Sequence, residues 1–221
     1  MSPCSRVKWG AGITLLQVVI FIAVLVVLAG MFFPALNNCR EPAHRILCRN
    51  NLNQLAKGMA TYLNEFGDNR WYSYPLGRGL RRYDYCGSEW LASLYWTGVV
   101  PDPGVFLCPK TKDTNNDGAD LGEHRAPSTF GPSSVSYAGM HLYSMTDEKG
   151  SAIPAAIPHD FPANRPMASD DTEGDVNHGT ADNGGMAVLF FDSHVEFRTN
   201  TELDLEHAVG QKGGLLERLR N

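Results

Sequence analysis

Hydrophobic residues form one unbroken block near the start of the chain. From Gly10 to Ala35 the sequence contains no Asp, Glu, Lys, Arg or His. The stretch Ile13 to Phe33 alone is about 21 residues long, enough for a helix to cross the roughly 30 Å hydrocarbon core of a bilayer. The pattern predicts a membrane helix over residues 13–34. A cleaved secretory signal is the alternative, although its apolar region is usually only about 7–15 residues long.

After the block, apolar residues recur every three to five positions. They form one stripe of an amphipathic helix over residues 35–66, which we expect to face the core of the following domain. Pro42 lacks a backbone N–H and clashes with the preceding turn, so we expect the helix to kink or restart between Asn38 and Pro42. The stripe consists of Leu36, Cys39, Ala43, Leu47, Leu52, Leu55, Met59, Tyr62 and Phe66.

Residues 67–221 combine short periodic segments with long polar stretches. We expect a helix from Ser88, as N-cap, to Trp96, and then a strand over Val105–Leu107. Strands over Met186–Phe191 and His194–Arg198 form the clearest hairpin, with a tight turn at Asp192-Ser193. These elements predict an α+β fold in which a long N-terminal helix packs on a small antiparallel sheet with long loops.

Composition and charge exclude several functions. The chain has 221 residues, a net charge of −5 and scattered Lys and Arg, so it lacks the basic surface of a nucleic-acid-binding protein. No Ser-His-Asp, HExxH or phosphate-loop pattern is present, and we therefore expect no catalytic residue and no enzyme. Basic residues lie on both sides of the apolar block, at Arg6 and Lys8 and at Arg40, Arg45 and Arg49, so charge alone does not settle the topology.

Of the five cysteines, Cys39, Cys48, Cys86 and Cys108 follow the apolar block. This even number favours an oxidising, extracytoplasmic compartment for the C-terminal part. Cys39 and Cys48 would lie about 13 Å apart on a continuous helix, too far for a disulfide. Cys86 and Cys108 enclose the expected helix and strand, and we predict a disulfide between them.

The segment Gly12-Ile13-Thr14-Leu15-Leu16, followed by the apolar helix and Pro34, resembles the N-terminal segment of prepilins and type II secretion pseudopilins. The resemblance implies that prepilin peptidase cleaves the leader, residues 1–12, after Gly12. Ile13 then becomes the methylated N-terminus, and the helix is retained. Family members usually carry a Glu where this chain has Gln17, and its carboxylate pairs with the N-terminal amine of a neighbouring subunit. Gln17 and Pro34 are thus the positions that the resemblance assigns to subunit assembly.

Two further segments resemble a bacterial prepilin-like family with a domain of unknown function and a C-terminal His-x9-Asp-Gly motif. The first is Cys48-Arg49-Asn50-Asn51-Leu52-Asn53-Gln54, within the predicted amphipathic helix. The second contains His178, Asp192 and His194, although thirteen residues separate His178 from Asp192 and Ser193 replaces the Gly. The resemblance implies a pilin-like fold and an extracytoplasmic globular domain over residues 67–221.

By this resemblance, the protein would be a structural subunit of a type II secretion or type IV pilus-like assembly, and Gln17 in place of the usual carboxylate favours a minor or tip subunit. Its partners would be prepilin peptidase, other pilin or pseudopilin subunits and membrane lipid. It would cross the bacterial inner membrane once, with a cytoplasmic N-terminus and a periplasmic or extracellular C-terminal domain. The alternative is a membrane-tethered binding or enzymatic domain that uses the prepilin signal only for export.

Two groups of residues could bind a cation. Near the C-terminus, His178, Asp192 and His194 could hold a divalent metal together with Asp170 or Asp171. The alternative is a hairpin whose polar side chains only satisfy backbone groups.

The sequence DTNNDG resembles the start of an EF-hand loop, with oxygen-bearing side chains at alternate positions before Gly118. It predicts a calcium site, with a solvated turn as the alternative. The candidate ligands are Asp113, Asn115, Asp117, Asp120 and Glu123.

Overall fold

The computed structural model describes the chain as two compact units, residues 1–40 and 41–221. The described residues are 14–69, 72, 86–124, 126–140, 143–146, 152–155, 161–170, 177–179, 184–202 and 209–220, with side chains left out at 32–39, 143–146 and 152–155. The predicted leader and the cleavage position, Gly12 and Ile13, lie outside the described residues.

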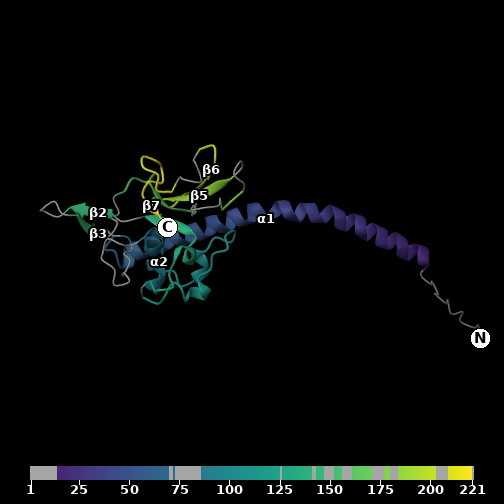
Figure 1. The fold of residues 1–221 in the computed structure, drawn as a ribbon, viewed down its shortest axis with the longest axis horizontal. Helices are drawn as coiled ribbons and strands as arrows, with labels where there is room; N and C mark the ends of the chain where they lie inside the picture. Colours follow the sequence, from purple (N-terminus) through teal and green to yellow (C-terminus); the bar gives the residue numbers. More distant parts are fainter. Residues whose placement is uncertain are drawn as a thin grey trace, which may run out of the picture. The chain divides into compact units, whose positions relative to one another are not determined.

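Helix α1 runs from Leu15 to Glu65 (Figure 1). Its start is a capping box that the sequence analysis did not identify. The Gln17 side chain accepts a hydrogen bond from Thr14 N (3.0 Å), and Gln17 N donates to Thr14 Oγ1 (3.4 Å). The helix is continuous through Pro34 and Pro42, so, of the kink or restart predicted between Asn38 and Pro42, the restart is wrong and the kink stays a prediction. A proline in a helix removes one hydrogen bond, and the turns on either side continue the helix here.

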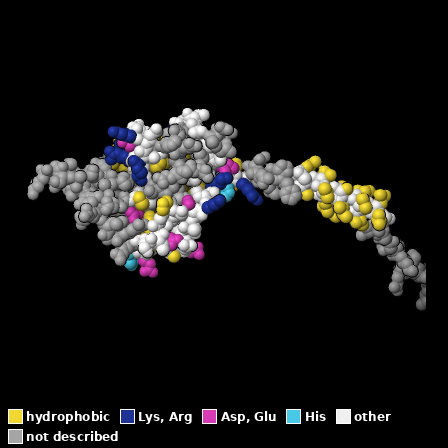
Figure 2. All heavy atoms as spheres, in the orientation of Figure 1, with side chains coloured by type: hydrophobic (Ala, Val, Ile, Leu, Met, Phe, Trp, Pro, Cys, Tyr) yellow, Lys and Arg dark blue, Asp and Glu magenta, His cyan; other side chains and the backbone are white. Residues whose placement is uncertain are grey.

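In the first unit, the apolar side chains of α1 are exposed on every side of the helix, from Leu15 to Met31. Figure 2 shows them as a yellow surface over this stretch. In the part of the chain that the structure describes, no helix combines the length and hydropathy that crossing a bilayer requires.

In the second unit, α1 buries one face. Leu52, Leu55 and Met59 are fully buried, as the stripe predicted, but Leu47 is 49% exposed and Phe66 is also exposed. Cys48 occupies the buried position in place of Leu47. The reason is the helical period, because Cys48 and Leu52 are one turn apart whereas Leu47 and Leu52 are not.

The main sheet is antiparallel and has five strands in the order β6-β5-β4-β1-β7. A separate hairpin joins β2 to β3. In Figure 1, β5 and β6 lie on one side of the second unit's part of α1 and α2 lies on the other. The strands are β1 Tyr137–Met140, β2 Tyr143–Thr146, β3 Ala152–Ala155, β4 Pro166–Asp170, β5 Gly185–Phe190, β6 Val195–Thr199 and β7 Leu219–Arg220.

Helix α2, Gly87–Trp96, packs its N-terminus directly on β1. Cys86 rather than Ser88 is its N-cap, and the Glu89 carboxylate accepts a hydrogen bond from Cys86 N (3.1 Å). The strand predicted over Val105–Leu107 is instead part of a short 3₁₀ helix, η1, at Pro103–Phe106. Asp102 caps it by accepting from Gly104 N (2.9 Å), which favours a helical turn.

Two further 3₁₀ turns, η2 at Asn116–Gly118 and η3 at Pro132–Ser134, lie in the polar segment before β1. The fold is α+β with a small antiparallel sheet, as predicted. The predicted hairpin is present as β5 and β6, and Ser193 in its turn has a positive φ of 70°. Strands β1 and β4 were not predicted.

Candidate functional site

Four buried side chains from distant parts of the second unit meet at one point. Cys48 comes from α1, Cys108 follows η1, Asp170 ends β4, and His178 pairs with Gly185 at the start of β5. Their sulfur, carboxylate and imidazole ligand atoms all lie within 4.8 Å of one another. We call these four residues the Cys-His-Asp cluster. Among the residues whose side chains are described, it is the only group of three or more His, Cys, Asp and Glu close enough to share a metal ion.

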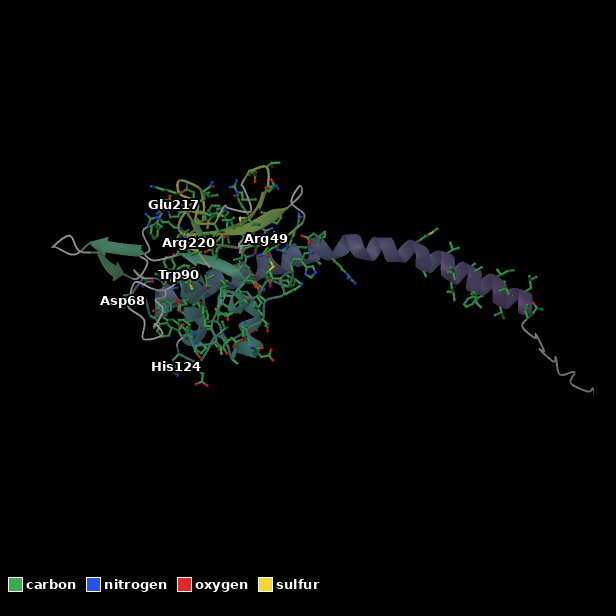
Figure 3. The ribbon with its side chains drawn as sticks, viewed as in Figure 1. Arg49, Asp68, Trp90, His124, Glu217 and Arg220 are labelled. Atoms are coloured by element: carbon green, nitrogen blue, oxygen red, sulfur yellow. A yellow bond between two sulfur atoms is a disulfide. The ribbon has the colours of Figure 1, made fainter. Side chains whose placement is uncertain are left out.

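The two cysteines of the cluster form a disulfide. Cys48 and Cys108 are bonded, with a Cα–Cα separation of 5.4 Å, inside the usual range for a bridge. The prediction of a Cys86–Cys108 disulfide is therefore wrong. Cys86 is a free thiol whose sulfur lies 2.9 Å from Ser88 Oγ. Figure 3 shows the yellow sulfur–sulfur bond on α1, beside the labelled Arg49.

The imidazole of His178 faces a different group with each nitrogen. Nε2 lies 3.4 Å from Asp170 Oδ2 and 3.6 Å from Cys108 Sγ. Nδ1 lies 3.4 Å from Glu41 Oε1. Burial lowers the pKa of His178, and the nearby Glu41 carboxylate opposes that shift only in part. His178 is thus neutral at pH 7, and a neutral imidazole carries a single N–H.

Glu41 links the cluster to the surface. Its carboxylate lies 3.2 Å from Lys110 Nζ and 3.2 Å from Arg45 Nε. Partial burial acts to raise the pKa of Glu41, but the hydrogen bonds from Lys110 and Arg45 outweigh it and the pKa is lowered. Glu41 is therefore ionised at pH 7, which favours a proton on His178 Nδ1 and leaves the Nε2 lone pair facing Asp170 and Cys108.

The structure places the predicted C-terminal metal ligands in two separate regions. His178 lies with Asp170 at the start of β5, whereas Asp192 and His194 lie beyond the end of β5, about 17 Å further along the strand. Asp192 accepts from His194 N (3.1 Å) and contacts the His194 ring, and both side chains are exposed. These two residues close the hairpin turn, while Asp171 lies outside the described residues.

The DTNNDG loop uses several of its candidate calcium ligands in protein hydrogen bonds. Asp113 accepts from Ser136 Oγ (2.6 Å). Asn115 is buried, donates to Pro103 O (2.8 Å) and caps Gly118 N (3.3 Å). Asp120 accepts from the Asn116 side chain. Asp117 has a φ of 54° and is exposed.

Glu123 is also exposed, as is His124, which Figure 3 labels at the outer edge of this region. The structure does not bring three carboxylates of this described loop together. The calcium site stays a prediction.

The sequence analysis identified His178 and Asp170 as ligand-type residues but missed Cys48, Cys108 and Glu41 as their neighbours. The helical period was the available signal for Cys48, because it places this residue in the buried stripe with Leu52 and Leu55. No sequence signal links α1 to a loop sixty residues later.

Known proteins offer no guide to the role of this cluster. No protein-family model matches the chain, and no curated protein or solved structure matches it either.

Proposed function

We propose that the chain is a pseudopilin-like structural subunit of a type II secretion or type IV pilus-like assembly. The first part of α1 anchors it in the bacterial inner membrane. The second unit is its extracytoplasmic domain, and its partners are prepilin peptidase, membrane lipid and other pilin-like subunits. This function is non-enzymatic.

The observation that carries the proposal is that one helix, α1, meets two different environments. From Leu15 to Met31 its side chains are apolar apart from Gln17, and they are exposed on all sides of the helix. Exposing this surface to water is unfavourable, and lipid or neighbouring apolar helices would cover it. From Cys48 to Leu63 one face is buried in the core of the second unit. An anchor that continues into the core of an attached domain is the arrangement expected of a pilin-like subunit.

The start of α1 supports a position with few neighbours in the assembly. Gln17 occupies the place of the usual carboxylate, and its side chain is hydrogen-bonded to Thr14 within the same helix. The cap satisfies an N-terminal backbone donor without a charge that would be costly in lipid. It also leaves no carboxylate for the amine of an adjacent subunit. A minor or tip subunit, which has fewer such contacts, accommodates this loss.

N-terminal processing tests the proposal in cells that express a prepilin peptidase. The mature protein should begin at Ile13 and keep its apolar helix, as read by N-terminal sequencing and intact mass. Gly12→Val should block cleavage, because the resemblance assigns the cut to the bond after this glycine, whereas Gly10→Val should not. A mature N-terminus near Gly30 or Met31 would show an ordinary signal peptide and overturn the proposal.

Crosslinking tests the assembly. A filament subunit should form crosslinked ladders in membranes and pellet with sheared surface fibres. A chain that begins at Ile13 yet stays monomeric in the membrane fraction would favour the alternative, a tethered binding domain.

A further inference from the structure

We propose that the Cys-His-Asp cluster is a redox-gated site for a zinc-class cation. With the Cys48–Cys108 disulfide formed, the site is closed to metal because neither sulfur is a thiolate. With the disulfide reduced, the two thiolates, His178 Nε2 and the Asp170 carboxylate bind one Zn²⁺. This inference does not depend on the proposed function.

Two distances between ligand atoms in the cluster match those of tetrahedral zinc. Ligands at tetrahedral angles, with Zn–N and Zn–O of about 2.1 Å and Zn–S of about 2.3 Å, place N and O about 3.4 Å apart and N and S about 3.6 Å apart. His178 Nε2 lies 3.4 Å from Asp170 Oδ2 and 3.6 Å from Cys108 Sγ. After reduction the two sulfurs must separate to about 3.8 Å in this geometry, and any other pair of ligand atoms that lies further apart, up to 4.8 Å, must close to about 3.4–3.8 Å.

The residues behind His178 and Asp170 are those that orient metal ligands. A histidine that binds a metal through one nitrogen usually directs its other N–H to a carboxylate. Glu41 supplies that carboxylate, 3.4 Å from Nδ1, and is itself held by Lys110 and Arg45. Asp170 Oδ2 accepts from Ala187 N (2.8 Å), which fixes the second ligand.

The imidazole also points to a cation. Each of its nitrogens lies 3.4 Å from a carboxylate, that of Glu41 or of Asp170. A metal ion between Nε2 and Asp170 converts this contact into two coordinate bonds.

The donor set selects the ion. Two thiolates and an imidazole favour Zn²⁺ over Ca²⁺ or Mg²⁺, which prefer oxygen ligands. Four protein ligands, all buried, leave no open position, as in structural zinc sites.

The gating step is a two-electron reduction of the Cys48–Cys108 bond. An external dithiol breaks it by thiol–disulfide exchange, giving up two electrons and two protons and becoming a cyclic disulfide. A phosphine breaks it by attack on one sulfur and is converted by one water molecule to the phosphine oxide, and that water supplies the two protons that the sulfurs take up as thiols. Zn²⁺ then displaces both thiol protons as it binds. When the ion is removed and an oxidant is added, the disulfide forms again and the two electrons pass to the oxidant.

The test uses the full chain purified in a non-ionic detergent. Oxidised chain and chain reduced with a phosphine in the presence of Zn²⁺ are desalted, and bound metal is measured by mass spectrometry. We expect one Zn²⁺ per reduced chain and none per oxidised chain. Co²⁺ in place of Zn²⁺ should give a thiolate-to-cobalt charge-transfer band and the visible bands of tetrahedral cobalt only after reduction.

Variants assign the ligands. Asp170→Asn and Cys48→Ser should abolish the cobalt bands. Glu41→Gln, which removes the carboxylate beside His178 Nδ1, should weaken Zn²⁺ binding about 10- to 100-fold and leave the bands in place. Cys86→Ser, the matched control, should bind one ion with unchanged affinity.

Several outcomes would overturn the proposal. The wild-type chain alone can overturn it. The reduced chain would then bind no Zn²⁺, or circular dichroism would show that it unfolds when Zn²⁺ is present. Equal binding by the oxidised chain, or loss of binding in Cys86→Ser, would show that a different site holds the metal.

Discussion

At the scale of single residues, Tyr72 shows how burial alone changes acid–base behaviour. Its side chain is 3% exposed and packs edge-on against Trp90 and Phe191, with ring centroids 6.4 Å and 5.4 Å away. Burial raises the pKa of Tyr72 from 10.0 to about 12, because the phenolate would lose its hydration.

Tyr72→Phe should make the protein less sensitive to alkali. Between pH 10 and 12 the unfolded chain releases the Tyr72 proton while the folded chain keeps it, so the stabilisation is complete below pH 10 and is lost as the pH rises towards 12. In this range the contribution of Tyr72 to the free energy of unfolding falls by up to about 1.4 kcal/mol per pH unit, and the variant lacks this loss. Denaturant unfolding at pH 7, 10 and 11, with Cys4, Cys39 and Cys86 all replaced by Ser so that no other thiol can exchange with the disulfide, measures this pH dependence. Parallel losses in the variant and its parent would contradict the assignment.

At the scale of elements, the sequence predicted those helices and strands whose residues form a clear pattern along the chain. The β5–β6 hairpin combines a six-residue apolar run in β5, apolar and polar residues that alternate in β6 and a recognisable turn between them, and the buried stripe of α1 follows the helical period at Leu52, Leu55 and Met59. Strands β1 and β4 carry no such signal. All their residues are buried, and a short strand that is buried on both faces shows no alternation. Pro166, which begins β4, also reads as a loop residue.

The contact between α2 and β1 depends on two glycines that meet backbone to backbone. A Cβ on Gly139 would overlap Gly87 O, and one on Gly87 would overlap Gly139 O and Arg220 O. All three of these obstacles are backbone oxygens, which cannot rotate away as a side chain can. Helix and sheet therefore approach more closely here than any larger residue permits.

Gly139→Ala should lower the free energy of unfolding by about 1–3 kcal/mol, the usual cost of overpacking, because α2 must move away from β1. Gly131→Ala is the matched control. Its Cβ would meet nothing within 4 Å and its φ of −150° suits any residue, so we expect a change within about 0.5 kcal/mol. Urea unfolding followed by circular dichroism measures both. Equal losses in the two variants would show that the close approach is not the cause.

At the scale of the whole molecule, the candidate site could not be read from the sequence because four separate segments build it. Cys48 and Cys108 are 60 residues apart in the sequence. Asp170 and His178 come later still, after β1. Their meeting depends on the strand order, which places β4 between β5 and β1. Pairing Cys108 with Cys86 assumed that the nearest candidate in sequence is the nearest in space, whereas the spine helix α1 brings Cys48 closer.

The disulfide ties this spine to the rest of the second unit. Under the loop-entropy account, closing 60 residues stabilises the folded state by about 4 kcal/mol.

Peptide mapping without reductant should find Cys48 linked to Cys108 and Cys86 as a free thiol. With EDTA present to exclude metal, the double variant Cys48→Ser, Cys86→Ser should lose about 2–5 kcal/mol relative to Cys86→Ser alone, as measured by urea unfolding. Cys86→Ser itself should match the wild type, because its thiol closes no loop. A linked peptide that contains Cys86 would contradict the Cys48–Cys108 pairing, and a double variant as stable as the single one would show that α1 is held by its buried face alone.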